Sequence, residues 1–148
     1  MEKMLAIMIG IQGSGKSTFY HEFLAADFVH VNLDTLKTRN QEKILIEHCI
    51  KQEKSFAVDN TNPTKEERQR YIPFAKAAGY KIVGYFMESK LKECIERNDQ
   101  RQGKEKVPSI AIASTSNKLQ LPTYDEGFDE LYFVKNDGKT ITISEWRE

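Results

Sequence analysis

The chain has 148 residues, which suits one domain with a single core, and its apolar fraction of 39% and charged fraction of 30% are typical of a soluble globular protein. Its 22 basic residues balance 22 acidic ones, which argues against strong, indiscriminate binding to nucleic acid but leaves room for a local basic groove. No apolar run is long enough to cross a membrane and the first residues lack a signal peptide, so we expect a cytoplasmic protein.

The first half of the chain alternates between predicted strands and helices. Short apolar runs predict strands at residues 4–9, 28–31 and 54–58. Between them, the spacing of apolar residues predicts a helix over 16–24 and a largely helical stretch over 35–52. The side chains expected to be buried by these helices are Phe19, Phe23, Leu24, Ile44, Leu45, Cys49 and Ile50.

The second half continues this alternation. A helix is expected from the capping residue Thr64 to the stop at Gly79, with Phe74 on its buried side and a kink at Pro73. A later helix begins at Ser89. The other elements expected here are a strand at 80–86, a helix at 108–119, a strand at 131–134 and a hairpin whose turn at 136–138 leads into a strand at 140–143.

Strands that alternate with helices predict an α/β fold, with a parallel five-stranded sheet flanked by helices on both faces. The C-terminal hairpin would add an antiparallel strand at one edge. The sequence shows no linker, repeat or low-complexity segment, so residues 1–148 are expected to form a single domain.

Residues 10–17 read Gly-Ile-Gln-Gly-Ser-Gly-Lys-Ser and directly follow the apolar run at 4–9. This is the pattern G-x-x-x-x-G-K-[ST] of a phosphate-binding loop (P-loop), placed where a buried strand leads into a helix. The glycines let backbone N–H groups approach phosphate oxygens, and the N-terminus of the following helix favours the same anion. Lys16 would neutralise the β- and γ-phosphates of a nucleotide, and the Ser17 hydroxyl would be a ligand of Mg²⁺.

Polar residues also follow the second and third predicted strands, where ligands of parallel sheets bind. Asp34 is a candidate general base that takes the proton of an attacking hydroxyl. Alternatively, it caps the helix that begins at Thr35. Asp59 would hold Mg²⁺ opposite Ser17, or it is a turn aspartate that begins the polar loop at 60–63.

Two arginines of the helix beginning at Ser89 are candidates for a lid over the phosphates. Arg97 and Arg101 lie four residues apart, so they share a helix face and could neutralise the charge that develops during phosphoryl transfer. The alternative is a solvated basic face that continues to Lys104 and Lys106. The three histidines, His30 among them, lack the spacing of metal ligands and are expected to be structural.

Six segments give the chain a resemblance to the 5′-hydroxyl polynucleotide kinases, the kinase domain of the phage and animal polynucleotide kinase/phosphatases. They are Gly-Ser-Gly-Lys-Ser-Thr at 13–18, Val-Asn-Leu-Asp-Thr-Leu at 31–36, Val-Asp-Asn-Thr-Asn-Pro at 58–63, Arg-Asn-Asp-Gln-Arg at 97–101, Val-Pro at 107–108 and Pro-Thr-Tyr-Asp-Glu-Gly-Phe at 122–128. The resemblance runs from about residue 4 to residue 134. It implies a P-loop kinase fold with a helical lid, and transfer of the γ-phosphate of ATP to the 5′-hydroxyl end of DNA or RNA.

The resemblance also implies a role for individual residues. Asp34 matches the general base, Asp59 the acidic residue at a strand end, Arg101 the lid arginine on the donor phosphates and Arg97 an adjacent lid position. The residues expected to contact the nucleotide are Gly10, Gly13, Ser14, Gly15, Lys16, Ser17 and Thr18, with Mg²⁺ bound by Ser17 and Asp59.

The acceptor side departs from the family pattern. Lys37 stands where the phage-type enzymes place an arginine that contacts the acceptor, and lysine keeps the charge but not the bidentate fork. Arg39 is an alternative contact, and Asn60 is a further candidate. The phosphatase motif Asp-x-Asp-x-Thr is absent from the sequence. Two other functions therefore stay open: a kinase of small-molecule or nucleoside hydroxyls, and a nucleotide-binding switch that would not need Asp34.

Overall fold

The structure is a computed structural model that describes residues 2–103 and 106–147, so the expected charge of Lys104 lies outside the described residues. The described elements in chain order are β1 (Met4–Ile9), α1 (Lys16–Phe19), the π-helical η1 (Tyr20–Leu24), β2 (Val29–Val31), α2 (Leu33–Leu36), α3 (Arg39–Lys51), β3 (Phe56–Val58), α4 (Lys65–Arg68), α5 (Ile72–Ala77), β4 (Lys81–Met87), α6 (Leu91–Asp99), α7 (Ser109–Lys118), the 3₁₀-helical η3 (Tyr124–Glu126), β5 (Glu130–Asn136) and β6 (Ile141–Glu145).

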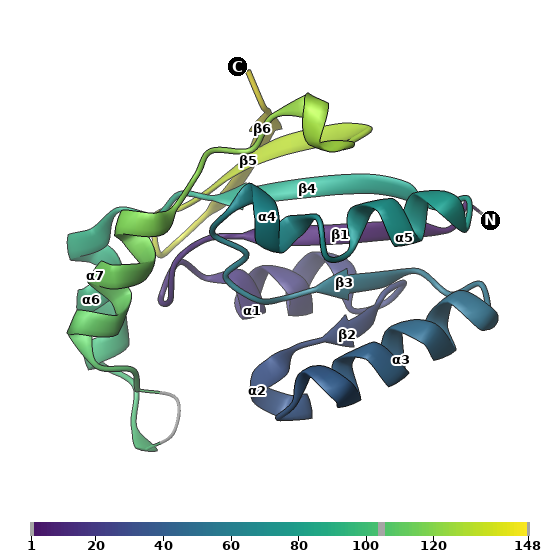
Figure 1. The fold of residues 1–148 in the computed structure, drawn as a ribbon. Helices are drawn as coiled ribbons and strands as arrows, with labels where there is room; N and C mark the ends of the chain where they lie inside the picture. The colour runs from purple at the N-terminus through teal and green to yellow at the C-terminus, as the bar shows by residue number, and fades with distance from the viewer. Residues whose placement is uncertain (1, 104–105, 148) are drawn as a thin grey trace.

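A sheet with β1 near its centre organises the fold (Figure 1). Across the described residues it has six strands in the order β2-β3-β1-β4-β5-β6, in which the first five are parallel and β6 is antiparallel to β5. Ala6 of β1 pairs with Ala57 of β3 on one side and with Val83 of β4 on the other. The predicted α/β fold, with a parallel five-stranded sheet and a C-terminal antiparallel hairpin, is confirmed.

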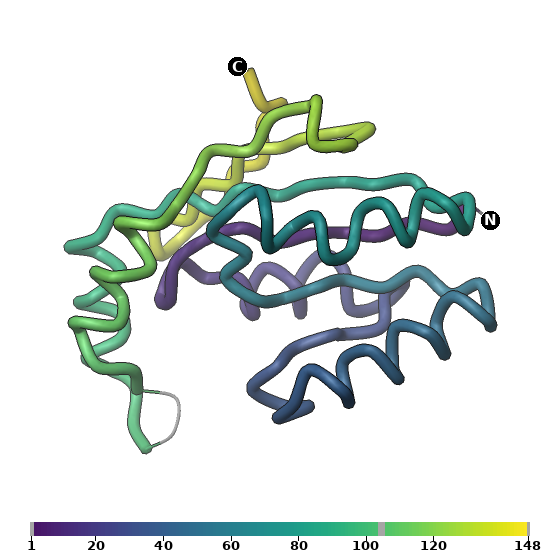
Figure 2. The backbone as a smooth tube through the Cα atoms, in the orientation of Figure 1, coloured from purple at the N-terminus to yellow at the C-terminus, as the bar shows by residue number. Residues whose placement is uncertain are grey.

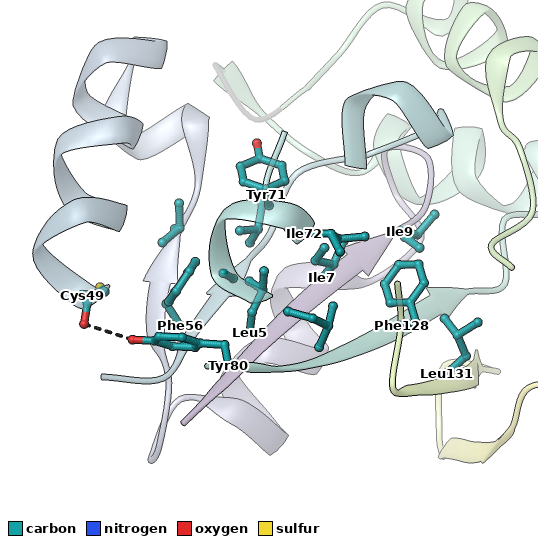
Figure 3. Packing of buried hydrophobic residues seen from close by; sticks show 14 of the residues in the cluster. Leu5, Ile7, Ile9, Cys49, Phe56, Tyr71, Ile72, Tyr80, Phe128 and Leu131 are labelled. Atoms are coloured by element: carbon teal, nitrogen blue, oxygen red, sulfur yellow. Dashed lines mark hydrogen bonds between the residues drawn. The ribbon is translucent and has the colours of Figure 1, made fainter. Parts of the chain in front are cut away.

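The two faces of the sheet carry different helices. In β1, Leu5, Ile7 and Ile9 pack toward α3 and α5, whereas Ala6 and Met8 pack toward α1 and η1. Figure 1 shows α3 and α5 in front of the strands and α1 behind them. Figure 3 shows the front cluster, in which the Tyr80 hydroxyl donates a hydrogen bond to the carbonyl oxygen of Cys49 at 3.2 Å.

Helices α6 and α7 lie beyond the carboxyl ends of the parallel strands, apart from the main layers (Figures 1 and 2). A small cluster of Ile11, Cys94 and Ile112 joins this pair to the loop after β1. This is the position expected for a helical lid over a site at the strand ends. None of the described helices is both long and apolar enough to span a membrane.

The structure corrects the predicted course of two helical stretches. Residues 35–52 are not one helix, because Lys37 adopts a φ of +76° and the Thr38 side chain caps a new helix, α3. The kink expected at Pro73 is a complete break between α4 and α5, with Pro73 in the first turn of α5. Proline suits that place because the first helical turn leaves its N–H without a partner in any case.

Three aromatic or aliphatic side chains predicted to be buried are exposed. The relative exposures of Phe23, Ile44 and Phe74 are 48%, 51% and 54%. Phe23 lies in the π-helical η1, whose wider turn rotates it away from the face expected for a 3.6-residue period. Ile44 and Phe74 lie on the outward sides of α3 and α5.

A buried ion pair joins α4 to η3. Arg68 is fully buried and its Nε lies 3.0 Å from Oε1 of Glu126. Its two terminal nitrogens donate to the carbonyl oxygen of Gln120, at 3.1 and 2.8 Å. The chain after α7 is therefore fastened to the segment that follows β3.

Removing one partner of this pair is expected to destabilise the fold strongly. Arg68→Met leaves the Glu126 carboxylate buried without its cation, so the free energy of unfolding measured by urea denaturation should fall by about 3–5 kcal/mol. Arg68→Met combined with Glu126→Gln should lose less than the sum of the two single changes. Lys3→Met, which removes the more exposed pair with Glu53, serves as the control and should change stability by about 0–1 kcal/mol.

Candidate active site

The P-loop connects β1 to α1, and two of its glycines are required by geometry. Gly13 and Gly15 have φ angles of +81° and +93°, which side chains rarely adopt. A Cβ atom on Gly13 would lie 2.4 Å from the carbonyl oxygen of Cys94 in α6. The backbone N–H of Gly10 donates to the carbonyl oxygen of Thr61 at 3.0 Å, so the loop is anchored to the segment after β3.

Several charged groups of the site act on the ammonium group of Lys16. Its Nζ donates hydrogen bonds of 3.0 Å to the carbonyl oxygens of Gly10 and Ile11. Burial lowers the pKa of the Lys16 ammonium from 10.5 to about 8; the carboxylates of Asp59 and Asp34 oppose this shift, and the positive charge of Arg101 adds to it. Two predicted acids and one predicted lid arginine therefore act on the same ammonium group.

Asp59 follows β3 and is only 2% exposed. Its Oδ2 accepts a hydrogen bond from the Ser17 hydroxyl at 2.9 Å and lies 2.7 Å from His30 Nε2, whereas its Oδ1 is buried without a hydrogen-bond partner among the described residues. Burial favours the neutral acid, but the His30 hydrogen bond, the Lys16 charge and the Ser17 hydroxyl outweigh it and hold the pKa of Asp59 below its usual 3.8. The group therefore stays ionised.

His30, which the sequence indicated as merely structural, contacts this carboxylate directly. Parallel pairing of β2 with β3 sets His30 opposite Ala57, so its side chain projects on the face where Asp59 follows. Its ring stacks on Tyr20 of η1, with ring centroids 4.0 Å apart. The only signal in the sequence is a polar residue inside a short apolar strand, and its partner depends on the strand order.

Asp34 lies in α2 at the same edge of the sheet. The cap of this helix is Asn32, whose side-chain oxygen accepts from the N–H of Thr35 at 3.2 Å, so Asp34 is not the capping residue. The Asp34 carboxylate is exposed, and it makes no hydrogen bond or ion pair with any other described residue. The N–H of the preceding residue, Leu33, donates to Asn60 Oδ1 at 3.0 Å, which holds this part of α2 against the segment after β3, and the charge of Asp34 acts on Lys16.

The two lid arginines differ in their surroundings. Arg97 donates to the carbonyl oxygens of Gly13 and Asn136, at 3.2 and 2.8 Å, so its guanidinium braces the back of the P-loop. Helix α6 begins at Leu91 rather than at Ser89 and ends at Asp99. Arg101 therefore lies beyond the helix, not on a shared helical face, and its charge reaches Lys16.

The acceptor-side candidates form a hydrogen-bonded group around Glu42. Arg39 Nη1 donates to Glu42 Oε1 and to the Tyr71 hydroxyl, both at 2.9 Å. Asn60 Nδ2 donates to Glu42 Oε2 at 2.9 Å, and its Oδ1 accepts from the N–H of Leu33 at 3.0 Å. Lys37 is exposed at the end of α2. Arg39 and Asn60 are thus brought together, whereas Lys37 stands apart from them.

The sequence did not identify Glu42 and Tyr71 as members of a candidate site. Glu42 is 2% exposed and Tyr71 is 4% exposed. Burial and the Glu42 carboxylate raise the pKa of the Tyr71 hydroxyl to about 12, so Tyr71 stays a hydrogen-bond donor at neutral pH. From sequence alone, a glutamate within a helix is expected to be exposed. Nothing in the local pattern around Glu42 indicates that Tyr71, which lies just before α5, is its partner.

Known proteins share this sequence and arrangement. A family model described as an AAA domain matches residues 5–122. The bifunctional polynucleotide phosphatase/kinase of Schizosaccharomyces pombe is 33% identical over 129 residues, which cover 84% of this chain and 31% of that protein. The putative bifunctional polynucleotide phosphatase/kinase of Acanthamoeba polyphaga mimivirus is 32% identical over 140 residues, which cover 90% of this chain and 33% of that protein.

The resemblance to polynucleotide kinase/phosphatases is thereby confirmed, and the chain spans about a third of the length of these curated relatives. A solved structure of the Pnkp1/Rnl/Hen1 RNA repair complex contains a chain of the same fold. Its TM-score is 0.67 at 23% identity, over 80% of this chain and 44% of that one.

The clash at Gly13 gives a direct test of the P-loop geometry. Gly13→Ala should weaken binding of a nucleoside triphosphate by at least about tenfold in calorimetric titration, because the loop must move away from Cys94. Gly138→Ala is the matched control: its φ is +91°, but no described atom lies within 4 Å of the added Cβ. The control should lose about 1–2 kcal/mol of stability and keep full nucleotide affinity.

Proposed function

Because the chain belongs to the AAA domain family whose model matches residues 5–122, we propose that it is a P-loop kinase that transfers the γ-phosphate of ATP to the 5′-hydroxyl end of DNA or RNA. The observation that carries this proposal is the unpaired Asp34 carboxylate, whose neighbour Leu33 is bound to the segment after β3 and whose charge acts on Lys16. A switch protein would need Lys16 but not a second, unpartnered acid whose charge acts on it. The names of the two curated relatives support a polynucleotide as the acceptor.

The donor side of the reaction rests on the P-loop. Its backbone N–H groups would surround the phosphates, and Lys16 would neutralise the β- and γ-phosphate oxygens. Lys16 is held by two loop carbonyl oxygens, so the phosphates compete for an ammonium that is already positioned. The proposed nucleotide contacts are Gly10, Gly13, Ser14, Gly15, Lys16, Ser17 and Thr18.

Ser17 and Asp59 fit a Mg²⁺ site. The buried Asp59 Oδ1 lacks a hydrogen-bond partner among the described residues, and the Ser17 hydroxyl adjoins the other oxygen of the same carboxylate. Mg²⁺ binds through one or two protein oxygens together with water and nucleotide phosphates, and a carboxylate beside a hydroxyl provides such oxygens. When bound, Mg²⁺ would neutralise charge on the β- and γ-phosphate oxygens.

On the acceptor side, Asp34 takes the proton of the attacking 5′-hydroxyl as its oxygen bonds to the γ-phosphorus, while the bond from that phosphorus to the β–γ bridging oxygen breaks and ADP leaves. Arg101 stabilises the negative charge that spreads over the transferred phosphoryl group and the leaving phosphate. Arg97 acts through the P-loop, since its guanidinium is bound to the Gly13 carbonyl oxygen. Arg39, Asn60 and Lys37 are the proposed contacts with the acceptor strand.

We further propose that residues 1–148 work as one kinase domain, because a single sheet runs from β1 to β6 through the described residues. The cytoplasm stays a prediction from the sequence. The partner required by the proposed reaction is a nucleic-acid end.

Replacing the proposed base should separate catalysis from nucleotide binding. Asp34→Asn is expected to lower kcat for a 5′-hydroxyl oligonucleotide by about 100-fold or more, the usual contribution of a general base, while the Kd for ATP stays within about twofold. Radiolabelled phosphate transfer and calorimetry measure the two quantities. Asp27→Asn, an exposed aspartate at the far end of β2, is the control and should leave both unchanged.

The same assay tests the acceptor class. Oligonucleotides with 5′-hydroxyl ends are compared with free nucleosides and sugars. Transfer to small acceptors alone would establish the kinase of small hydroxyl compounds instead. Unchanged nucleotide turnover in Asp34→Asn would favour the switch.

Lys16 should be required for ATP binding but contribute little to the stability of the fold. Lys16→Met is expected to weaken ATP binding by at least about tenfold, because the phosphates lose their cation. Its thermal midpoint should stay close to that of the wild type, because methionine removes the desolvation cost of the half-buried ammonium together with the favourable effect of its charge on Asp59. Calorimetric binding and thermal unfolding measure both effects, with the exposed Lys51→Met as the control; a large drop in the midpoint would contradict this prediction.

A further inference from the structure

The groove between α3 and α5 contains a pocket of about 440 Å³ that the proposed chemistry does not use. Phe56 of β3 and Tyr71 form part of its floor, and Phe74 lines it as a side chain that is 54% exposed. Figure 3 shows Phe56 beside the helix that carries Cys49, with Tyr71 across from it. This volume lies in the range of pockets that bind small organic groups. We call it the α3–α5 pocket.

The rim of the α3–α5 pocket is basic. Arg39, Lys43 and Arg70 line it together with Glu42 and Glu47. Glu42 is buried and engaged by Arg39 at 2.9 Å, and Glu47 lies 4.0 Å from Lys43. The Arg70 guanidinium is exposed and has no hydrogen bond or ion pair within the part of the chain that is described. The rim thus carries one net positive charge, on a group available to an anion.

The pocket is continuous with the proposed acceptor site. Arg39 and Tyr71 both contact Glu42, and Glu42 accepts a hydrogen bond from Asn60. Asn60 in turn accepts from the N–H of Leu33, the residue before Asp34. Arg39, which is exposed and is a proposed acceptor contact, also lines the pocket, so a strand whose 5′ end lies at Asp34 can reach the pocket past this side chain.

We propose that the α3–α5 pocket binds a nucleobase of the acceptor strand, downstream of the 5′-terminal nucleotide, with the base stacked on Phe74 and a neighbouring phosphate paired with Arg70. This inference rests on the proposed kinase function and deepens it. Stacking on an aromatic ring accepts every base, so the pocket selects a chain over a free nucleoside without selecting a sequence. A nucleic-acid strand presents bases and phosphates in turn, so an aromatic side chain beside an unpaired arginine can bind one of each.

Acceptor length provides the first test. The series runs from a 5′-hydroxyl nucleoside 3′-phosphate to single strands of about eight nucleotides, within the range that one binding groove covers. For the wild type, KM should fall about tenfold once the strand reaches the pocket and then stay constant, with little change in kcat. An abasic nucleotide at the position where the fall occurs should restore the higher KM.

Two variants tie this length effect to the pocket. Phe74→Ala should raise KM for long acceptors about tenfold and leave KM for the shortest acceptor and kcat unchanged. Arg70→Ala should weaken the binding of long strands. It should also make the fall of log affinity with log salt less steep, by about 1. Phe23→Ala removes a phenylalanine of similar exposure, 48%, from the opposite face of the sheet and should behave as the wild type.

Binding is measured separately from catalysis, by fluorescence anisotropy of a labelled strand. A KM independent of length, or equal effects of Phe74→Ala on short and long acceptors, would overturn the pocket and leave the kinase standing. Strand binding that Phe74→Ala weakens, without phosphate transfer to any strand, would refute the proposed function and retain the docking surface. Self-association of the chain that Phe74→Ala abolishes in sedimentation would assign the pocket to a second copy instead.

Discussion

The buried, ionised carboxylate of Asp59 is the constraint on which the site depends. Burial opposes its charge, so the carboxylate stays ionised only while Ser17, His30 and Lys16 supply hydrogen bonds and positive charge. These partners come from two places in the chain, the start of α1 at the end of the P-loop and β2. Satisfying one charge therefore fixes the end of β3 against the phosphate loop, and it leaves the second carboxylate oxygen, Oδ1, for a ligand.

The segment that begins with Asp59 joins several parts of the chain. Each of the four residues after it makes at least one hydrogen bond to a residue outside the segment. These bonds join Asn60 to Leu33, Thr61 to Gly10, Asn62 to Met8 and Pro63 to Gln120. The bonds of Asn60 and Asn62 use their side chains, whereas those of Thr61 and Pro63 use backbone carbonyl oxygens, so a change at either asparagine would remove its bond directly. The loop thus aligns the donor loop, the proposed base and the chain that follows the lid.

The sequence was sufficient for features that depend on near neighbours along the chain. The P-loop, the polar residues at the strand ends and the terminal hairpin all follow from local patterns. The structure confirms the fold that these patterns imply. Contacts that depend on register were missed: His30 meets Asp59 only because β2 lies beside β3. Periodicity also failed for Phe74, because a helix pattern cannot tell a core contact from the wall of an open pocket.

The junction between α2 and α3 connects the two halves of the proposed acceptor site. Lys37 holds a φ of +76° there, a conformation that costs a residue other than glycine about 1–2 kcal/mol. Asn32 caps the helix before it and Thr38 caps the helix after it, so the strain is imposed from both sides. The tight turn separates Asp34 in α2 from Arg39 in α3, which lines the α3–α5 pocket. Strain at this one residue therefore sets the spacing between the proposed base and the surface proposed to hold the rest of the strand.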